Sequence, residues 1–146
     1  MVDKLIILYL CSFLFAKDER VYPKKIDYKT WKVVNYVGET WYVNHKDIIG
    51  KNQEFIKGWA EGIFFSCQGG RSSTYTSYSV EEFLNNKEFD LFNKIDFKSN
   101  KGKIFVHRIS CFEKENSQIK VLYPLVSQQN SNQIYYLFEG AIYILE

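Results

Sequence analysis

The sequence is poor in several residue types on which common protein functions depend. Of its 146 residues only two are histidine and three are cysteine, and no Cys-x-x-Cys pair occurs. His45 and His107 lie far apart and outside any His-Glu-x-x-His pattern, so the sequence does not indicate a zinc site. The absence of a Cys-x-x-Cys pair leaves a thioredoxin-like redox function unsupported. We therefore expect no bound metal ion and no cofactor.

Charge and catalytic motifs are equally sparse. The 19 basic and 17 acidic residues give a net charge of +2, which is too small to indicate a nucleic-acid partner. No Gly-x-Ser-x-Gly motif occurs, and the hydroxyl-rich stretch 72–79 is most simply an outward-facing polar strand. We therefore expect a protein that is not an enzyme.

No apolar run is long enough to cross a bilayer, which takes roughly 20 residues for about 30 Å. The uncharged segment from Leu5 to Ala16 has the length of a signal-peptide core, with Ala16 as the small residue before cleavage. We expect residues 1–16 to be a signal peptide and residues 17–146 to form one exported domain without an integral membrane span. A first buried strand or an uncleaved anchor is the alternative.

Removal of residues 1–16 would leave two cysteines, Cys67 and Cys111. Two cysteines in an exported domain favour one disulfide, and two buried free thiols are the alternative. Closing a loop of roughly 45 residues stabilises a fold by about 4 kcal/mol in the chain-entropy model.

Aromatic residues, by contrast, are abundant: 18% of the chain, with 12 Phe, 11 Tyr and 3 Trp. This content favours a β-rich domain with a large aromatic core. Hydrophobic alternation and turn signals predict about eight short strands, mostly antiparallel. They cover residues 31–36, 40–43, 61–67, 72–78, 103–112, 118–125, 133–138 and 141–145. On the first strand we expect Trp31, Val33 and Asn35 to share a face.

Between the strands, two segments have a different character. Ser79 with Glu82 forms a capping box and predicts one helix, or two short ones, ending at about Asn93. Residues 44–60 show no clear period and predict a long apolar loop folded over the body, with a helical turn around 52–57. Eight antiparallel strands close most naturally into an up-and-down barrel, and a sandwich is the competing architecture.

Trp31 on the first strand, the long apolar loop 44–60 and the strand meander after it resemble the pattern of the lipocalin, or calycin, family. The chain looks most like the divergent lipocalin-like proteins that some bacteria export to the periplasm. The resemblance implies a lipocalin-like barrel, a periplasmic or secreted location in a Gram-negative bacterium, and binding of a small hydrophobic or amphipathic ligand without catalysis.

The candidate ligand-binding residues are aromatic side chains expected at the barrel interior or its rim, together with one histidine. They are Trp41, Trp59, Phe65, Tyr78, Phe105, His107, Tyr123 and Tyr136. His107 is in phase with Phe105 and Ile109, so it could orient a ligand head group, or be a core histidine bonded to a neighbour. The rings could equally fill the core and leave no cavity.

A second function remains open, that of a periplasmic protein–protein interaction module such as an inhibitor or an envelope-assembly factor. The last hairpin, 133–145, is apolar on both faces, and Tyr135, Leu137 and Tyr143 could present a surface for a protein partner or a homodimer. A small basic loop with Lys98, Lys101 and Lys103 is either solvated or docks to an anionic partner or membrane surface.

Overall fold

The structure is a computed structural model that describes residues 26, 29–39, 43–56, 59–67, 71–112, 119–121 and 124–146. The predicted signal peptide and most of the predicted strand 40–43 lie outside these residues.

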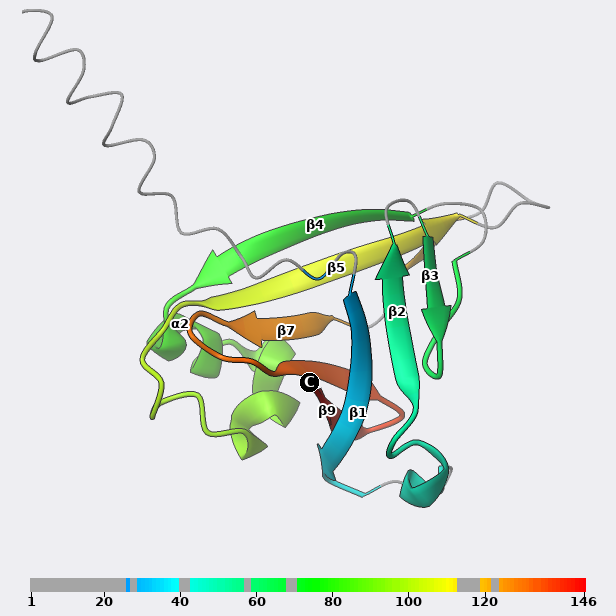
Figure 1. Ribbon diagram of the computed structural model, residues 1–146. Helices are drawn as coiled ribbons and strands as arrows, with labels where there is room; N and C mark the ends of the chain where they lie inside the picture. Colours follow the sequence, from blue (N-terminus) through cyan, green and yellow to red (C-terminus); the bar gives the residue numbers. More distant parts are fainter. Residues whose placement is uncertain are drawn as a thin grey trace, which may run out of the picture.

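One antiparallel sheet dominates the fold (Figure 1). Its strands are β1 (Lys29–Val37), β2 (Asn52–Ile56), β3 (Trp59–Gly62), β4 (Arg71–Tyr78), β5 (Ile104–Phe112), β6 (Ile119–Val121), β7 (Leu125–Gln128), β8 (Ile134–Phe138) and β9 (Ala141–Leu145). Their order is β3-β2-β1-β9-β8-β7-β5-β4, and the short β6 pairs beside β5. The predicted mainly β, antiparallel, lipocalin-like architecture is confirmed.

The strand order is that of an up-and-down meander whose last strand returns to its first. Consecutive strands along the path lie beside each other, and β9 pairs with β1. Within the described residues no ladder joins β3 to β4, so the sheet curls into a half-barrel with a seam between these two strands. Pairing of β1 with β9 joins the first three strands to the rest of the sheet, and β3 and β4 are the two ends of the strand order.

A disulfide crosses the seam. Cys67 forms an isolated antiparallel bridge with Ala60 of β3. Its side chain is bonded to Cys111 of β5, with the two Cα atoms 5.3 Å apart and a sequence separation of 44. The disulfide predicted from the cysteine count is therefore present, and it joins the two ends of the strand order.

Buried apolar side chains form two clusters on opposite faces of the sheet. The inner core contains residues from both ends of the strand order. Such residues can meet only on the concave face of the curled sheet. It comprises Ile26, Trp31, Val33, Ile48, Phe55, Ala60, Cys67, Ile109, Cys111, Leu125, Ile134, Tyr136, Ala141, Tyr143 and Leu145. The outer core lies on the other face, and comprises Phe83, Phe89, Phe92, Ile95, Phe97, Ile104, Val106, Val126, Tyr135 and Ile142.

Helical segments cover the outer face of the sheet. The α-helix α2 (Val80–Leu84) is followed by the 3-10 segment η2 (Lys87–Lys94), and Ser79 and Glu82 form the predicted capping box. Phe83 of α2 stacks on Phe89 of η2 with ring centroids 4.7 Å apart, and both rings belong to the outer core. The prediction of one helix or two short ones after Ser79 is confirmed.

The first strand departs from regular alternation at a bulge between Val33 and Asn35. Val33 pairs with Leu145 of the inner core, whereas Asn35 pairs with Ile144, which packs against the outer core. The prediction that Asn35 shares a face with Val33 is therefore wrong, because the extra residue shifts the alternation. The same shift brings Tyr36 opposite Tyr143 on the inner face.

The prediction of a long loop over residues 44–60 is also wrong. This segment contains the 3-10 turn η1 (His45–Asp47) and the β2–β3 hairpin, in which Ile56 pairs with Trp59. The strands have only five and four residues, too few for a clear alternating pattern. The residues predicted to form a helical turn around 52–57 instead form β2 over Asn52–Ile56.

Two strand boundaries also differ from the sequence prediction. The strand predicted over 61–67 ends at Gly62, and residues 63–66 continue as an irregular segment. The strand predicted over 118–125 is divided into β6 and β7, and β7 extends to Gln128.

Candidate functional site

The irregular segment after β3, residues 63–66, is held against the inner face by one buried glutamine. Gln53 of β2 accepts hydrogen bonds from the backbone N–H groups of Phe64 and Phe65, at 3.1 and 3.3 Å. Its amide nitrogen donates to the carbonyl oxygen of Phe65 at 3.2 Å. Gln53 is 1% exposed, so these three hydrogen bonds satisfy the polar atoms of a buried side chain. They also fix residues 63–66 against β2. We call residues 63–66 the strap.

The strap leaves β3 through a glycine that has no room for a side chain. A Cβ on Gly62 would lie 2.5 Å from both the carbonyl oxygen of Asn52 and the Cα of Gln53. Backbone atoms cannot give way as a flexible side chain can, so the close approach of strap and β2 requires glycine here.

The strap places two phenylalanine rings among aromatic residues of β8 and β9. Phe64 lies 4.8 Å from Tyr136, 5.3 Å from Tyr143 and 5.4 Å from Phe138, measured between ring centroids. Phe65 lies 5.8 Å from Tyr136. Phe64, Phe65 and Phe138 are only partly buried, whereas Tyr136 and Tyr143 lie behind them in the inner core. We call these five rings the aromatic rim.

Polar groups lie beside the aromatic rim. The Nδ1 atom of His45 is hydrogen-bonded to the hydroxyl of Tyr143 at 2.8 Å. The ring of His45 stacks on Tyr36, with centroids 3.6 Å apart. Burial, and then the neighbouring Tyr36, raise the pKa of Tyr143, so its hydroxyl stays protonated at neutral pH. The imidazole of His45 and the exposed phenol of Tyr36 thus lie next to partly exposed rings, and can form hydrogen bonds with a polar head group, whereas Tyr143 is buried and holds His45 in place.

A second polar pair lies deeper, on β5 and β7. The Nε2 atom of His107 is 3.0 Å from the hydroxyl of Ser127, and both side chains are buried. Burial lowers the pKa of His107 to about 4, so the ring is neutral at pH 7. His107 therefore has the position of a core histidine bonded to a neighbour. This is one of the two roles predicted from its place in the strand, the other being contact with a ligand head group.

The structure brings together only some of the predicted site residues. Phe65 and Tyr136 are in contact at the aromatic rim. Phe105 and His107 lie on β5 against Tyr75 of β4, with centroid distances of 6.3 and 6.2 Å.

Tyr78, predicted to line the interior, contacts Phe83 and Phe89 in the outer core instead. The alternation of hydroxyl and aromatic residues in β4 does not reveal which face turns inward. Trp59 is described only as a backbone position in β3, and Trp41 and Tyr123 lie outside the described residues.

Several residues at the aromatic rim were not among the sequence candidates. A regular strand over 61–67 would turn Phe64 away from Phe65, so only the irregular strap allows both rings to reach the inner face. His45 and Gln53 come from the segment predicted as a loop. Phe138 and Tyr143 are in phase with Tyr136 across the last hairpin, and this signal could have identified them.

The last hairpin does not present the exposed surface that the protein-interaction hypothesis needs. Tyr135 is 7% exposed and Tyr143 is fully buried, and Leu137 is partly buried against the outer core. Its outer face packs on the helical segments and its inner face on the strap.

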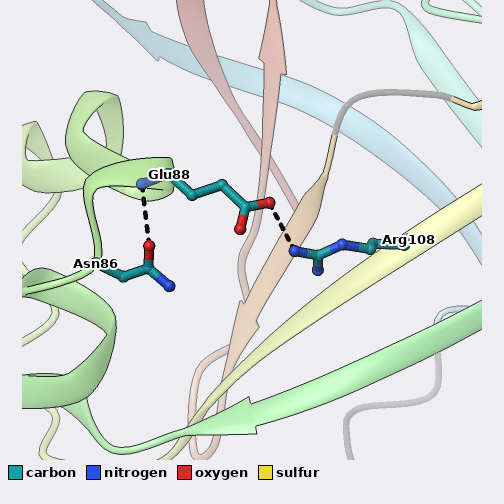
Figure 2. Close-up of polar contacts among 3 residues, drawn as sticks. All are labelled: Asn86, Glu88 and Arg108. Atoms are coloured by element: carbon teal, nitrogen blue, oxygen red, sulfur yellow. Dashed lines mark hydrogen bonds and ion pairs between the residues drawn. The ribbon is translucent and has the colours of Figure 1, made fainter.

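Arg108 of β5 lies on the outer face and connects the sheet to η2 (Figure 2). One of its terminal nitrogens lies 2.6 Å from a carboxylate oxygen of Glu88. Asn86 caps the start of η2 by accepting a hydrogen bond from the backbone N–H of Glu88 at 3.0 Å. The two charged side chains are 37% and 54% exposed, so the pair contributes at most about 1 kcal/mol.

No group of three or more His, Cys, Asp and Glu side chains in the described residues could hold a metal ion. Of the helices in the described part of the chain, none has the length and apolar character needed to cross a membrane. No family model, no curated protein and no solved structure significantly matches this chain.

Proposed function

We propose that the protein is an exported, non-enzymatic binding protein that holds a small hydrophobic or amphipathic molecule against the inner face of the half-barrel. The aromatic rim is the observation that carries this proposal. Three phenylalanine rings remain partly exposed there, although the surrounding inner core is tightly buried. Apolar surface gathered on a concave face with a few polar groups is typical of small-molecule sites.

The polar groups beside the rim define the ligand class more closely. Tyr36 and His45 offer hydrogen-bonding groups beside the rim, and the buried hydroxyl of Tyr143 holds the His45 ring in place. A molecule with an apolar or aromatic body and one neutral polar end fits this arrangement best, because the body can stack on Phe64 and Phe138.

Binding can be tested with N-phenyl-1-naphthylamine, an uncharged fluorescent probe of the proposed class. We expect saturable, one-site binding by the intact protein. Phe64→Ala and Phe138→Ala each remove a ring from the rim, and should weaken binding by about tenfold, equivalent to about 1.4 kcal/mol. Leu91→Ala is the matched control, because Leu91 is 47% exposed on η2 and outside the rim.

Two results would contradict the proposal. The first is a probe affinity that is equal in the parent protein, the two rim variants and the control. The second is a loss of affinity in the Leu91 variant as large as that in the rim variants. If either alanine variant unfolds, the leucine variant at the same position keeps the volume and still removes the aromatic ring.

Native mass spectrometry of protein purified from its own host would test for the natural ligand. A co-purifying small molecule of fixed mass is the expected result. A bare chain with a tightly held protein partner would favour the interaction module instead.

Export is the second part of the proposal. The Cys67–Cys111 disulfide supports it, because disulfides persist mainly outside the reducing cytoplasm. Protein recovered from the periplasm or the medium should begin at Lys17 and carry no free thiol. Full-length protein with alkylatable Cys67 and Cys111, confined to the cytoplasm, would contradict it.

A further inference from the structure

A second concave site lies on the outer side of the molecule, away from the aromatic rim. It is a groove of about 580 Å³ between α2 and the loop that leads into β5. Its lining residues are Ser79, Val80, Glu81, Leu84, Asn85, Lys98, Lys101, Gly102 and Lys103. None of them belongs to the inner core, so this groove is distinct from the proposed ligand site.

The groove carries an excess of positive charge. Three of its lining residues are lysines and one, Glu81, is acidic, and all four side chains are exposed. None of the three lysines forms an ion pair with another described residue. Val80 and Leu84 are partly buried and add apolar surface beside the charges.

The backbone that carries the lysines is fixed rather than loose. The buried side chain of Gln128 donates hydrogen bonds to the carbonyl oxygens of Phe97 and Gly102, at 2.9 and 3.0 Å. The backbone N–H of Gln129 donates to the carbonyl oxygen of Lys103 at 2.9 Å. A Cβ on Gly102 would lie 2.5 Å from the carbonyl oxygen of Gln129, so the loop is in close backbone contact with the residue that follows β7. The backbone positions of the lysines are therefore set before any ligand binds, so only the side chains lose freedom on binding.

Lys101 itself has a backbone conformation that its side chain disfavours. Its φ angle is +59°, in the left-handed region, where glycine and asparagine are the preferred residues. A non-glycine residue of this kind costs about 1 kcal/mol or more, and such residues cluster at functional sites. Lys101 therefore occupies this turn at a cost in backbone strain, as Asn130 and Glu139 do at theirs.

We propose that this groove binds a phosphate-bearing anion, with Lys98, Lys101 and Lys103 as its cationic ligands. The excess of two positive charges in the lining matches the two negative charges of a phosphate monoester near neutral pH. Lysine ammonium groups are common phosphate ligands and act as mobile point charges. The phosphate can belong to a soluble molecule or to a lipid head group, and both sources present the same chemistry.

The test uses two probes and the full exported chain. Inorganic pyrophosphate is titrated calorimetrically at low ionic strength. Vesicles of phosphatidylcholine with phosphatidic acid are used for co-sedimentation, with pure phosphatidylcholine vesicles as the background. We expect saturable binding to at least one probe. A preference for pyrophosphate would identify a soluble molecule as the source of the phosphate, and a preference for phosphatidic acid would identify a lipid.

Variants separate a built site from general charge attraction. Lys101→Asn removes a charge and keeps a residue that tolerates the left-handed conformation, so the fold should be retained while affinity falls at least tenfold. Glu81→Gln removes the acidic group and should tighten binding roughly threefold. Lys46→Asn is the matched control, because Lys46 is an exposed lysine on η1 outside the groove. The affinity of this variant for the probes should differ from that of the parent protein by less than twofold.

The proposal is overturned if neither probe binds the parent protein, or if Lys46→Asn weakens binding as much as Lys101→Asn does. Should Lys101→Asn prove unstable, the double variant Lys98→Gln, Lys103→Gln makes the same test on residues with ordinary backbone angles. Binding of N-phenyl-1-naphthylamine should be unchanged in these groove variants, which keeps the result independent of the aromatic rim.

Discussion

At the residue scale, His107 shows how a titratable group is accommodated inside an apolar core. Its ring is 7% exposed, and Ser127 provides its hydrogen-bond partner. Because burial disfavours the charged imidazolium, the pKa of His107 falls from the ordinary 6.5 to about 4. Folding therefore favours the neutral ring.

This burial predicts a pH dependence of stability. The unfolded chain binds a proton at His107 as the pH falls below about 6.5, whereas the native protein binds one only near pH 4. The contribution of His107 is therefore fully present above pH 6.5 and is lost as the pH falls to 4. The loss lowers the free energy of unfolding by about 3 kcal/mol, as measured by urea unfolding.

His107→Gln is the control for this dependence, because an amide can still bond to Ser127 and does not titrate. The decrease in stability between pH 7 and pH 4 should be smaller in this variant by about 3 kcal/mol. Equal decreases in the two proteins would show that His107 does not titrate in the way its burial requires.

At the element scale, the β2–β3 hairpin and its strap position the aromatic rim. Gln53 and Gly62 lie opposite each other in this hairpin, and both act on the strap. The sequence predicted the β8–β9 hairpin well because apolar residues run through both strands and Glu139-Gly140 marks a tight turn. It did not predict β2–β3, because neither strand is long enough to show its period.

The hairpin predicts a large difference between two glycine substitutions. Gly62→Ala forces a Cβ against backbone atoms of β2 and should lower the free energy of unfolding by about 3 kcal/mol. Gly50→Ala meets no atom within 4 Å, and carries only the penalty of its φ angle of +85°, about 1 kcal/mol. Thermal and urea unfolding of the two variants measure this difference.

The two glycine variants should also differ in their affinity for the fluorescent probe. Gly62→Ala disturbs Gln53, whose Oε1 atom would lie 2.8 Å from the new Cβ, so the strap and the affinity for N-phenyl-1-naphthylamine should both suffer. Gly50→Ala should leave the affinity unchanged. Equal stability losses, or an intact affinity in the Gly62 variant, would mean that the strap does not depend on this glycine.

At the scale of the whole molecule, the half-barrel is held at its two junctions by different interactions. Backbone pairing between β1 and β9 joins one side, and the Cys67–Cys111 disulfide joins the other. Replacing both cysteines with alanine should lower the free energy of unfolding by about 4 kcal/mol, because the unfolded chain regains the entropy of a long loop.

A reductant provides the matched comparison for this variant. It should reproduce the loss of stability in the parent protein and have no effect on the double variant. A double variant as stable as the parent would contradict the view that the disulfide secures the seam. Hydrogen exchange should locate the loosening in β4, β5 and the strap, the elements next to the bond.

The sequence by itself determined the mainly β class, the capping box at Ser79 and the last hairpin, and it favoured a disulfide between Cys67 and Cys111. These features depend on short-range patterns or on a residue count, and both can be read along the chain. Tertiary structure alone decided which rings share the inner face. The β1 bulge brings Tyr36 opposite Tyr143, and the strap turns both Phe64 and Phe65 inward. It also decided that Tyr78 packs outward. In each case the face is set by partners distant in sequence, because alternation defines two faces but cannot say which of them is concave.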